Sequence, residues 1–249
     1  MRTSNPTLND QVFLREPRSY AHTDQVMSLE GTVNKSFILL GILLLTAGWT
    51  WFQFFASYNP MSVRGLMMVG GFGGFGVALV TVFKRDWSAY TAPIYSALQG
   101  LFIGGLSALF EAQYPGIVIQ ATSLTFATAA SMLISYKMGW IQVSDQFRRG
   151  LMIATGAIAL VYFVNIIMTL FGSGMPFIHS SGPMGIVFSL VVVGIAALNL
   201  LLDFDFIARG SRARLPKYME WYAAFGLMVT LIWLYIEILR LLAKLRDRR

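Results

Sequence analysis

The chain has 249 residues, of which 56% are hydrophobic and only 12% are charged, and it contains no cysteine. Soluble domains have roughly 45–50% apolar and about 25% charged residues, so this composition indicates a polytopic membrane protein. The lack of cysteine excludes disulfides and thiolate chemistry. The net charge of +7 does not indicate a nucleic-acid partner. The basic residues lie in short runs between apolar segments, which is typical of loops that face an anionic membrane surface.

Residues 1–35 mix both charge signs with Pro, Ser, Asn and Thr and show no sustained periodicity. This pattern predicts a polar cytoplasmic tail, followed by a transmembrane domain over residues 36–249. The tail contains no apolar core of signal-peptide type, so we expect the first helix to act as the signal anchor.

Seven apolar segments follow, each close to the roughly 20 residues that span a bilayer as a helix. They are predicted at Ser36–Ala56, Gly65–Phe83, Tyr90–Phe110, Ile117–Tyr136, Leu151–Phe171, Met184–Ile207 and Trp221–Leu242. Turn residues separate them, for example Tyr114, Pro115 and Gly116 between the third and the fourth. The predicted fold class is therefore an all-α membrane protein, a bundle of seven transmembrane helices packed as one domain.

Lys and Arg are distributed unequally between the two sides of the membrane. The tail and the second, fourth and sixth connections carry thirteen of them, whereas the opposite connections carry only Arg64. The positive-inside rule therefore predicts a cytoplasmic N-terminus. Seven spans would place the C-terminus outside, although five basic residues follow Leu239. The last segment either spans the membrane with a basic outer end, which its full apolar length favours, or re-enters it.

The glycine-rich second segment contains a G-x-G-x-x-G string at Gly71–Gly76. A dinucleotide site needs this string between a strand and a helix, and here it lies within a predicted membrane helix. Glycines three or four residues apart instead allow neighbouring helices to approach closely. We therefore interpret two groups as packing sites: Gly70, Gly73 and Gly74, and Gly100 with Gly104.

The sequence shows no pattern of an enzyme. His22 and His179 lie outside the predicted spans, and there is no H-E-x-x-H string, clustered metal ligands or nucleophile paired with a base. No lysine occupies the middle of the seventh segment, which excludes a retinal Schiff base. We expect no enzymatic activity, no cofactor and no metal centre.

The sixth segment carries two aspartates, at a cost of roughly 2.5–3.5 kcal/mol for a charge at the centre of a membrane helix. Asp203 and Asp205 point about 200° apart on a helix, so they cannot share a face. Asp205 lies four residues before Arg209 and is placed to pair with it. Asp203 lies one turn from Asn199. Because desolvation disfavours an ionised carboxylate, we interpret Asp203 as a buried acid that responds to pH.

A second carboxyl group would have to come from the seventh helix. A short hairpin would bring Glu220 beside Asp203, whereas Glu237 lies about 25 Å further along and could instead pair locally with Arg240. Two carboxyl groups in one desolvated site cannot both ionise easily, so such a pair would sense pH. We interpret Gln120, Asn165 and Asn199 as buried polar groups that either hold helices together or line a pathway, and the first role is the commoner one.

Three stretches resemble the Bax-inhibitor family, in particular its bacterial YccA-like branch: LNLLLDFDFIARG at Leu198–Gly210, the closing WLYIEILRLLAKL, and YPGIVIQ at Tyr114–Gln120. The likeness covers the chain after the tail. It implies seven helices with a central last helix, a location in the bacterial inner membrane, and a pH-dependent calcium leak. The family's acid on the sixth helix matches Asp203, in a D-x-x-x-I frame closed by Ile207. Its aspartate on the seventh helix has no direct counterpart, so Glu220 and Glu237 both remain candidates.

Two functional hypotheses follow. In the first, the chain lies in the lipid bilayer as a channel for calcium or another cation, and a carboxyl pair between the sixth and seventh helices gates it. In the second, it transports nothing and acts through its N-terminal tail as a regulator or substrate of a membrane quality-control protease.

Overall fold

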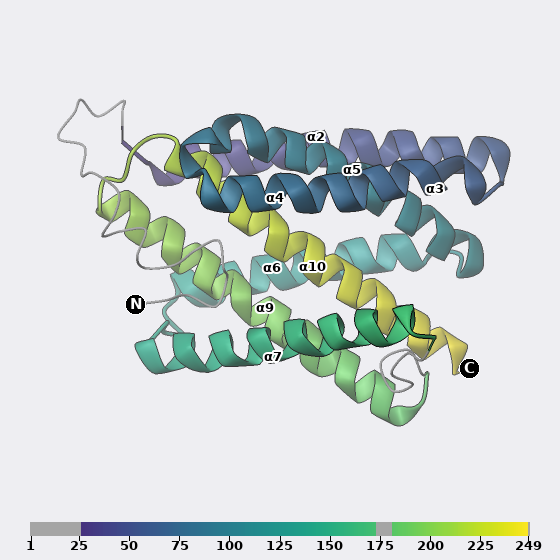
Figure 1. Ribbon diagram of the computed structural model, residues 1–249. Helices are drawn as coiled ribbons and strands as arrows, with labels where there is room; N and C mark the ends of the chain where they lie inside the picture. The colour runs from purple at the N-terminus through teal and green to yellow at the C-terminus, as the bar shows by residue number, and fades with distance from the viewer. Residues whose placement is uncertain (1–25, 173–180, 249) are drawn as a thin grey trace. The chain divides into compact units, whose positions relative to one another are not determined.

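The structure is a computed structural model that describes residues 26–172 and 181–248. Over these residues it is all-α, with no β-strand and with seven helices long and apolar enough to cross a membrane. Figure 1 shows the helices in order along the chain. They are α2 (Leu29–Ser57), α3 (Met61–Met68) continued by the π-helical turn η2 (Val69–Gly73) and α4 (Gly74–Phe83), the 3-10 turn η3 (Arg85–Trp87) continued by α5 (Ser88–Gln113), α6 (Ile117–Lys137), α7 (Asp145–Leu170), α9 (Pro183–Arg212) and α10 (Met219–Asp247). The all-α, seven-span prediction is confirmed.

The predicted spans coincide with the helices, but several helices extend beyond the apolar runs. Helix α2 begins at Leu29, seven residues before the predicted Ser36, because the side chain of Ser28 caps it by accepting a 2.9 Å hydrogen bond from the amide of Gly31. Helix α9 continues to Arg212, past the two aspartates and Arg209. Hydropathy marks the part of a helix that lies in lipid, whereas its ends are set by capping.

The chain forms two compact units. The α2–α5 unit comprises residues 26–115 together with Phe206–Val229. The α6–α7 unit comprises the described residues of Gly116–Asp205 and Thr230–Arg249. Helices α9 and α10 contribute residues to both units, and α9 changes from one to the other directly after Asp205.

Close helix packing in the α2–α5 unit depends on glycine. Helix α5 packs against α2, and it also packs against the continuous helix formed by α3, η2 and α4 (Figure 1). A Cβ atom at Gly104 would lie 2.7 Å from the Cα of Ala47, and one at Gly70 would lie 2.7 Å from the amide nitrogen of Phe102. These distances leave no room for a side chain, so the prediction that these glycines are packing sites is confirmed.

In the α6–α7 unit, one face of α7 is turned inward. Leu151 and Ile158 on this face are buried, and the ring of Tyr162 packs edge-on against Phe188 of α9 with the centroids 6.2 Å apart. The rings of Tyr136 on α6 and Phe204 on α9 are 6.3 Å apart. These ring contacts join α7 and α6 to α9.

Candidate functional site: a polar column in the α6–α7 unit

Helix α7 carries its polar side chains on the inward face. Arg148, Thr155 and Tyr162 are seven residues apart in sequence, which is close to two helical turns, so they lie above one another on one side of the helix. Leu151 and Ile158 fall between them on the same side and are buried. Each of the three polar side chains has a polar partner on α9 or α10.

The first contact is an ion pair. Nη2 of Arg148 donates a 2.9 Å hydrogen bond to Oδ2 of Asp205 on α9, and the two side chains are 5% and 14% exposed. Nη1 of Arg148 is also 3.6 Å from Oδ1 of Asp145 in the first turn of α7. The sequence suggested Arg209, four residues on, as the partner of Asp205, and that pairing stays a prediction; the ion pair that the structure shows is with an arginine of another helix.

The second contact is between two uncharged groups. Nδ2 of Asn199 on α9 donates to Oγ1 of Thr155 at 2.9 Å and to the carbonyl oxygen of Ile195 at 2.8 Å. Asn199 is 3% exposed. The predicted burial of Asn199 is therefore confirmed, and its contact with Thr155 links α7 to α9.

The third contact surrounds Glu237 of α10. The hydroxyl of Tyr162 donates to both carboxylate oxygens, at 2.9 and 3.0 Å. Nη1 of Arg240 lies 3.3 Å from Oε1, which is the local pair that the i, i+3 spacing indicated. The guanidinium of Arg240 also stacks over the Tyr162 ring, 5.6 Å from its centroid. Glu237 is buried, whereas Arg240 is about half exposed.

A buried lysine makes the fourth contact. Nζ of Lys244 on α10 donates to Oγ of Ser189 at 2.7 Å and to the carbonyl oxygen of Gly185 at 3.1 Å, both on α9. Lys244 is 9% exposed and Ser189 is 2% exposed. A charged side chain withdrawn from water in this way is costly unless it makes such bonds.

These four contacts form a polar column, defined by Arg148 with Asp205, Thr155 with Asn199, Tyr162 with Glu237, and Lys244 with Ser189. Asp205 and Ser189 are sixteen residues apart on α9, which corresponds to roughly 24 Å at 1.5 Å per residue. The hydrocarbon core of a bilayer is about 30 Å thick, so the column extends through most of it. Ionisable side chains within membrane helices are rare and often mark ion or proton pathways.

Asp203 lies on α9 one helical turn from Asn199, and its position on the helix is about 200° away from that of Asp205. It is completely buried, as the sequence predicted, and belongs to the same unit as Asp205 and Asn199. Glu237 contacts Tyr162, fourteen residues and roughly 21 Å along α7 from Arg148. Glu237 is therefore at a different depth from Asp203, and the two carboxyl groups cannot share a proton directly.

Glu220 opens α10 in the other unit, where several cationic and polar groups surround it. Its Oε2 pairs with Nζ of Lys35 on α2, and its Oε1 lies 3.2 Å from Nζ of Lys217. The amide and the hydroxyl of Ser28 each donate to Oε1 at 2.9 Å. Gly31 leaves the space that the carboxylate fills. Glu220 thus ties the start of α2 to the start of α10, and its pairing with Asp203 stays a prediction.

The remaining candidates are separate from the column. Asn165 is buried on α7, as predicted, and its carbonyl oxygen accepts a 2.8 Å hydrogen bond from Thr169. The predicted burial of Gln120 is wrong: the residue is exposed in the first turn of α6, where its Oε1 accepts a 3.1 Å hydrogen bond from Arg246. His22, His179 and residues 1–25 of the tail lie outside the described residues. Within the described ranges, no three His, Cys, Asp or Glu side chains gather as a metal site.

Sequence reasoning missed most partners of the column, namely Arg148, Thr155, Tyr162, Ser189 and Lys244. One signal was available, since Arg148, Thr155 and Tyr162 recur every seven residues of α7. Lys244 gave no signal of its own, because a lysine near the end of a span is normally expected to reach the membrane surface.

Comparison with known proteins agrees with this architecture. A search of curated proteins and a search of solved structures each gave no match. The family model described as Bax inhibitor 1 like matches residues 5–247, nearly the whole chain. The chain therefore belongs to the Bax inhibitor 1-like family and is an integral membrane protein.

Proposed function

We propose that this protein is a pH-sensitive cation leak channel, with calcium as the first candidate ion, and that the polar column is its pathway. The observation that carries the proposal is the column itself, in which side chains of α7, α9 and α10 place hydrogen-bonding groups along roughly 24 Å of α9. Membership of the Bax inhibitor 1-like family supports the same reading.

The charges of the column give a physical basis for pH dependence. The column carries Asp205 and Glu237 together with Arg148 and Lys244, and Asp203 is a further buried acid on α9. Each proton that binds to one of these acids adds one positive charge, which repels a divalent cation strongly in a low-dielectric pathway. The leak is therefore expected to be small at low pH and to rise as the pH rises.

In this proposal Asp203 is the acid that gates the pathway, because it is completely buried on α9, one helical turn from Asn199 of the column. Glu237 is a second acid of the proposed pathway, at a different position along α7. Glu220 remains the candidate for a carboxyl pair with Asp203, with its partners Lys35 and Lys217 fixing its position. Proton sharing between the two acids would hold α9 and α10 together, and ionisation of both would force them apart or bind a cation.

The direct experiment is calcium flux into liposomes that contain the purified full-length chain and a trapped calcium indicator. We expect a flux above that of protein-free liposomes at neutral pH and a smaller flux in acidic buffer, where the acids of the pathway bind protons. Repeating the assay with sodium, potassium and proton indicators identifies the preferred ion. Flux equal to that of protein-free liposomes for all of these ions would contradict the proposal and leave the interaction hypothesis.

A further inference from the structure

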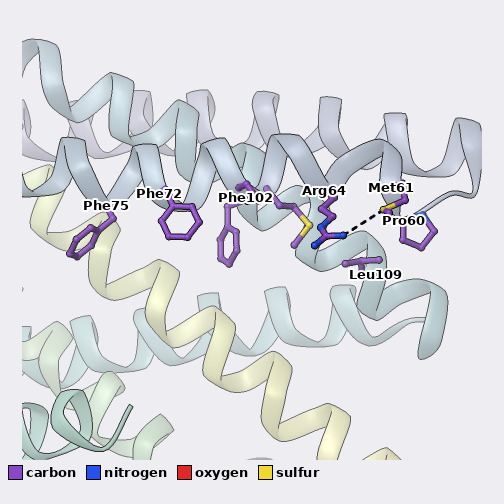
Figure 2. A pocket seen from close by; sticks show the side chains of 10 residues that line it. Pro60, Met61, Arg64, Phe72, Phe75, Phe102 and Leu109 are labelled. Carbon is purple, nitrogen blue, oxygen red and sulfur yellow. Dashed lines mark hydrogen bonds between the residues drawn. The ribbon is translucent and has the colours of Figure 1, made fainter. Parts of the chain in front are cut away.

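A long apolar groove lies in the α2–α5 unit, away from the polar column. It is formed between α3, η2 and α4 on one side and α5 on the other, with a volume of about 720 Å³. Figure 2 shows the rings of Phe75, Phe72 and Phe102 in a row, with Arg64 and Met61 at the end next to Pro60. Among the ten residues that line the groove, Arg64 is the only one with a charge.

The π-helical turn shapes the floor of this groove. The turn η2 (Val69–Gly73) interrupts the helix at a run of glycines, and such π-helical insertions occur frequently at functional sites. Gly70 is pressed against the backbone of α5, whereas Gly71 lies among the lining residues. A Cβ atom at Gly71 would lie 3.6 Å from the Phe102 ring, which is an ordinary van der Waals contact. A side chain could therefore be placed at this position, and glycine leaves that space open to the groove.

The dimensions of the groove match one lipid chain. Arg64 and Phe75 are eleven residues apart, or roughly 16 Å along the helix, and half of a hydrocarbon core is about 15 Å. The chemistry of the groove also matches a lipid, because the end at Phe75 is lined by aromatic and glycine residues and the end at Arg64 by a guanidinium. The guanidinium of Arg64 is exposed, and Nη1 lies 3.9 Å from the Met61 sulfur. A sulfur atom at that distance is a weak partner, so the guanidinium retains donors for an anion.

We propose that this groove binds one acyl chain of an anionic phospholipid, with Arg64 donating hydrogen bonds to the phosphate. An arginine fork binds phosphate oxygens in a bidentate manner, and this would hold the lipid phosphate at the Arg64 end of the groove. The rings of Phe72, Phe75 and Phe102 contact the acyl chain. A zwitterionic lipid offers the same phosphate, but its ammonium group cancels the net charge, so the site prefers an anionic head group such as glycerol phosphate. The proposal does not depend on Asp203 or on the polar column.

The test uses the full-length chain in bilayer nanodiscs that contain a phospholipid with a photoactivatable diazirine in the middle of one acyl chain. Two probes are compared, phosphatidylglycerol and phosphatidylcholine, each at a low fraction in unlabelled phosphatidylcholine. After irradiation, mass spectrometry locates the labelled residues. We expect labelling concentrated at Phe72, Phe75 and Phe102 and greater with the phosphatidylglycerol probe. Labelling spread equally over the exposed residues of α2, such as Phe37, Leu45 and Phe52, would overturn the proposal.

Variants separate the head-group contact from the chain contact. Arg64→Gln removes a charge-assisted hydrogen bond and should lower the preference for phosphatidylglycerol about tenfold while leaving the apolar groove in place. Gly71→Leu should fill the groove and reduce its labelling by both probes. Gly76→Leu is the matched control, because nothing lies within 4 Å of a Cβ atom at Gly76, and its labelling should equal that of the unchanged protein.

Folding of each variant is checked by circular dichroism and by elution as a single species. If Gly71→Leu does not fold, Gly71→Ala and Arg64→Gln still decide the question. An unchanged probe preference in Arg64→Gln, in a folded protein, would refute the role of the guanidinium. Labelling of the groove that is equal in Gly71→Leu and Gly76→Leu would refute the groove as the site of the acyl chain.

Discussion

Arg148 of α7 and Asp205 of α9 form an ion pair whose side chains are 5% and 14% exposed, with 2.9 Å between Nη2 and Oδ2. The two residues are fifty-seven positions apart in sequence, and their pair joins α7 to α9. It lies two residues from the completely buried Asp203. The ion pair therefore holds to α7 the same turn of α9 that carries the proposed gating acid.

Loss of this arginine should destabilise the protein strongly. Arg148→Gln leaves the buried carboxylate of Asp205 without its partner on α7, and breaking a buried ion pair costs roughly 3–5 kcal/mol. The double variant Arg148→Gln with Asp205→Asn removes both charges and should recover part of that loss. Thermal unfolding in detergent measures both effects. Arg149→Gln, at the exposed neighbouring position, is the control and should change little. Equal unfolding temperatures for the two single arginine variants would contradict this account of the pair.

Close packing of α5 on α2 predicts a second stability effect. Gly104→Val places a side chain against the backbone of Ala47, which is 2.7 Å from the Cβ position, and overpacking of this kind costs about 1–3 kcal/mol or more. Gly48→Val on α2 is the matched control, since nothing lies within 4 Å of its Cβ position. The unfolding temperature should fall for Gly104→Val only. If both variants unfold together, close packing at Gly104 does not stabilise the unit.

The contact between Tyr162 and Glu237 predicts an effect on transport. Tyr162→Phe removes the hydroxyl that donates to both carboxylate oxygens and keeps the ring that packs on Phe188. We expect the calcium flux at neutral pH to change severalfold while the fold is retained, because one hydrogen bond to a charged group contributes about 1.5–3 kcal/mol. Tyr90→Phe, at a tyrosine that is 77% exposed, is the control. Identical flux in the two variants would remove Glu237 from the pathway.

A deletion series separates the channel from a protein that acts through its tail. Removing residues 2–24 leaves the bridge between Val26 and Pro216 and the bonds from Ser28 to Glu220 in place. The channel account therefore predicts an unchanged flux. Removing residues 2–30 deletes Ser28, which caps α2, and should lower stability by about 1 kcal/mol or more. Loss of flux in the shorter deletion, with the fold intact, would instead place the function in the tail.

The sequence was sufficient to predict the seven helices, because long apolar segments separated by turn residues have few alternatives in a membrane. It also predicted the burial of Asp203 and the local pair of Glu237 with Arg240, which depend on one helix alone. The contacts between helices were not predictable in the same way. Arg148 and Lys244 are basic residues near the ends of spans, and composition assigns such residues to the membrane surface.

The error at Gln120 has the same origin. Its place within an apolar run suggested burial, but burial depends on which face of α6 is turned toward a neighbouring helix. Helix α6 has too little polar–apolar asymmetry to show that face, since its apolar residues surround the helix. The α7 stripe of Arg148, Thr155 and Tyr162 shows the opposite case, in which spacing identifies the inward face without naming the partner.

The central claim is that protonation of Asp203 closes a cation pathway, and the most direct measurement is the pH dependence of calcium flux in Asp203→Asn. Asparagine imitates the protonated acid in size and charge. The variant should show, at every pH from about 5 to 8, the low flux that the unchanged protein shows only at acidic pH. Asp86→Asn, at an exposed aspartate, should keep the rise with pH. A pH profile of Asp203→Asn that coincides with that of the unchanged protein would contradict the claim.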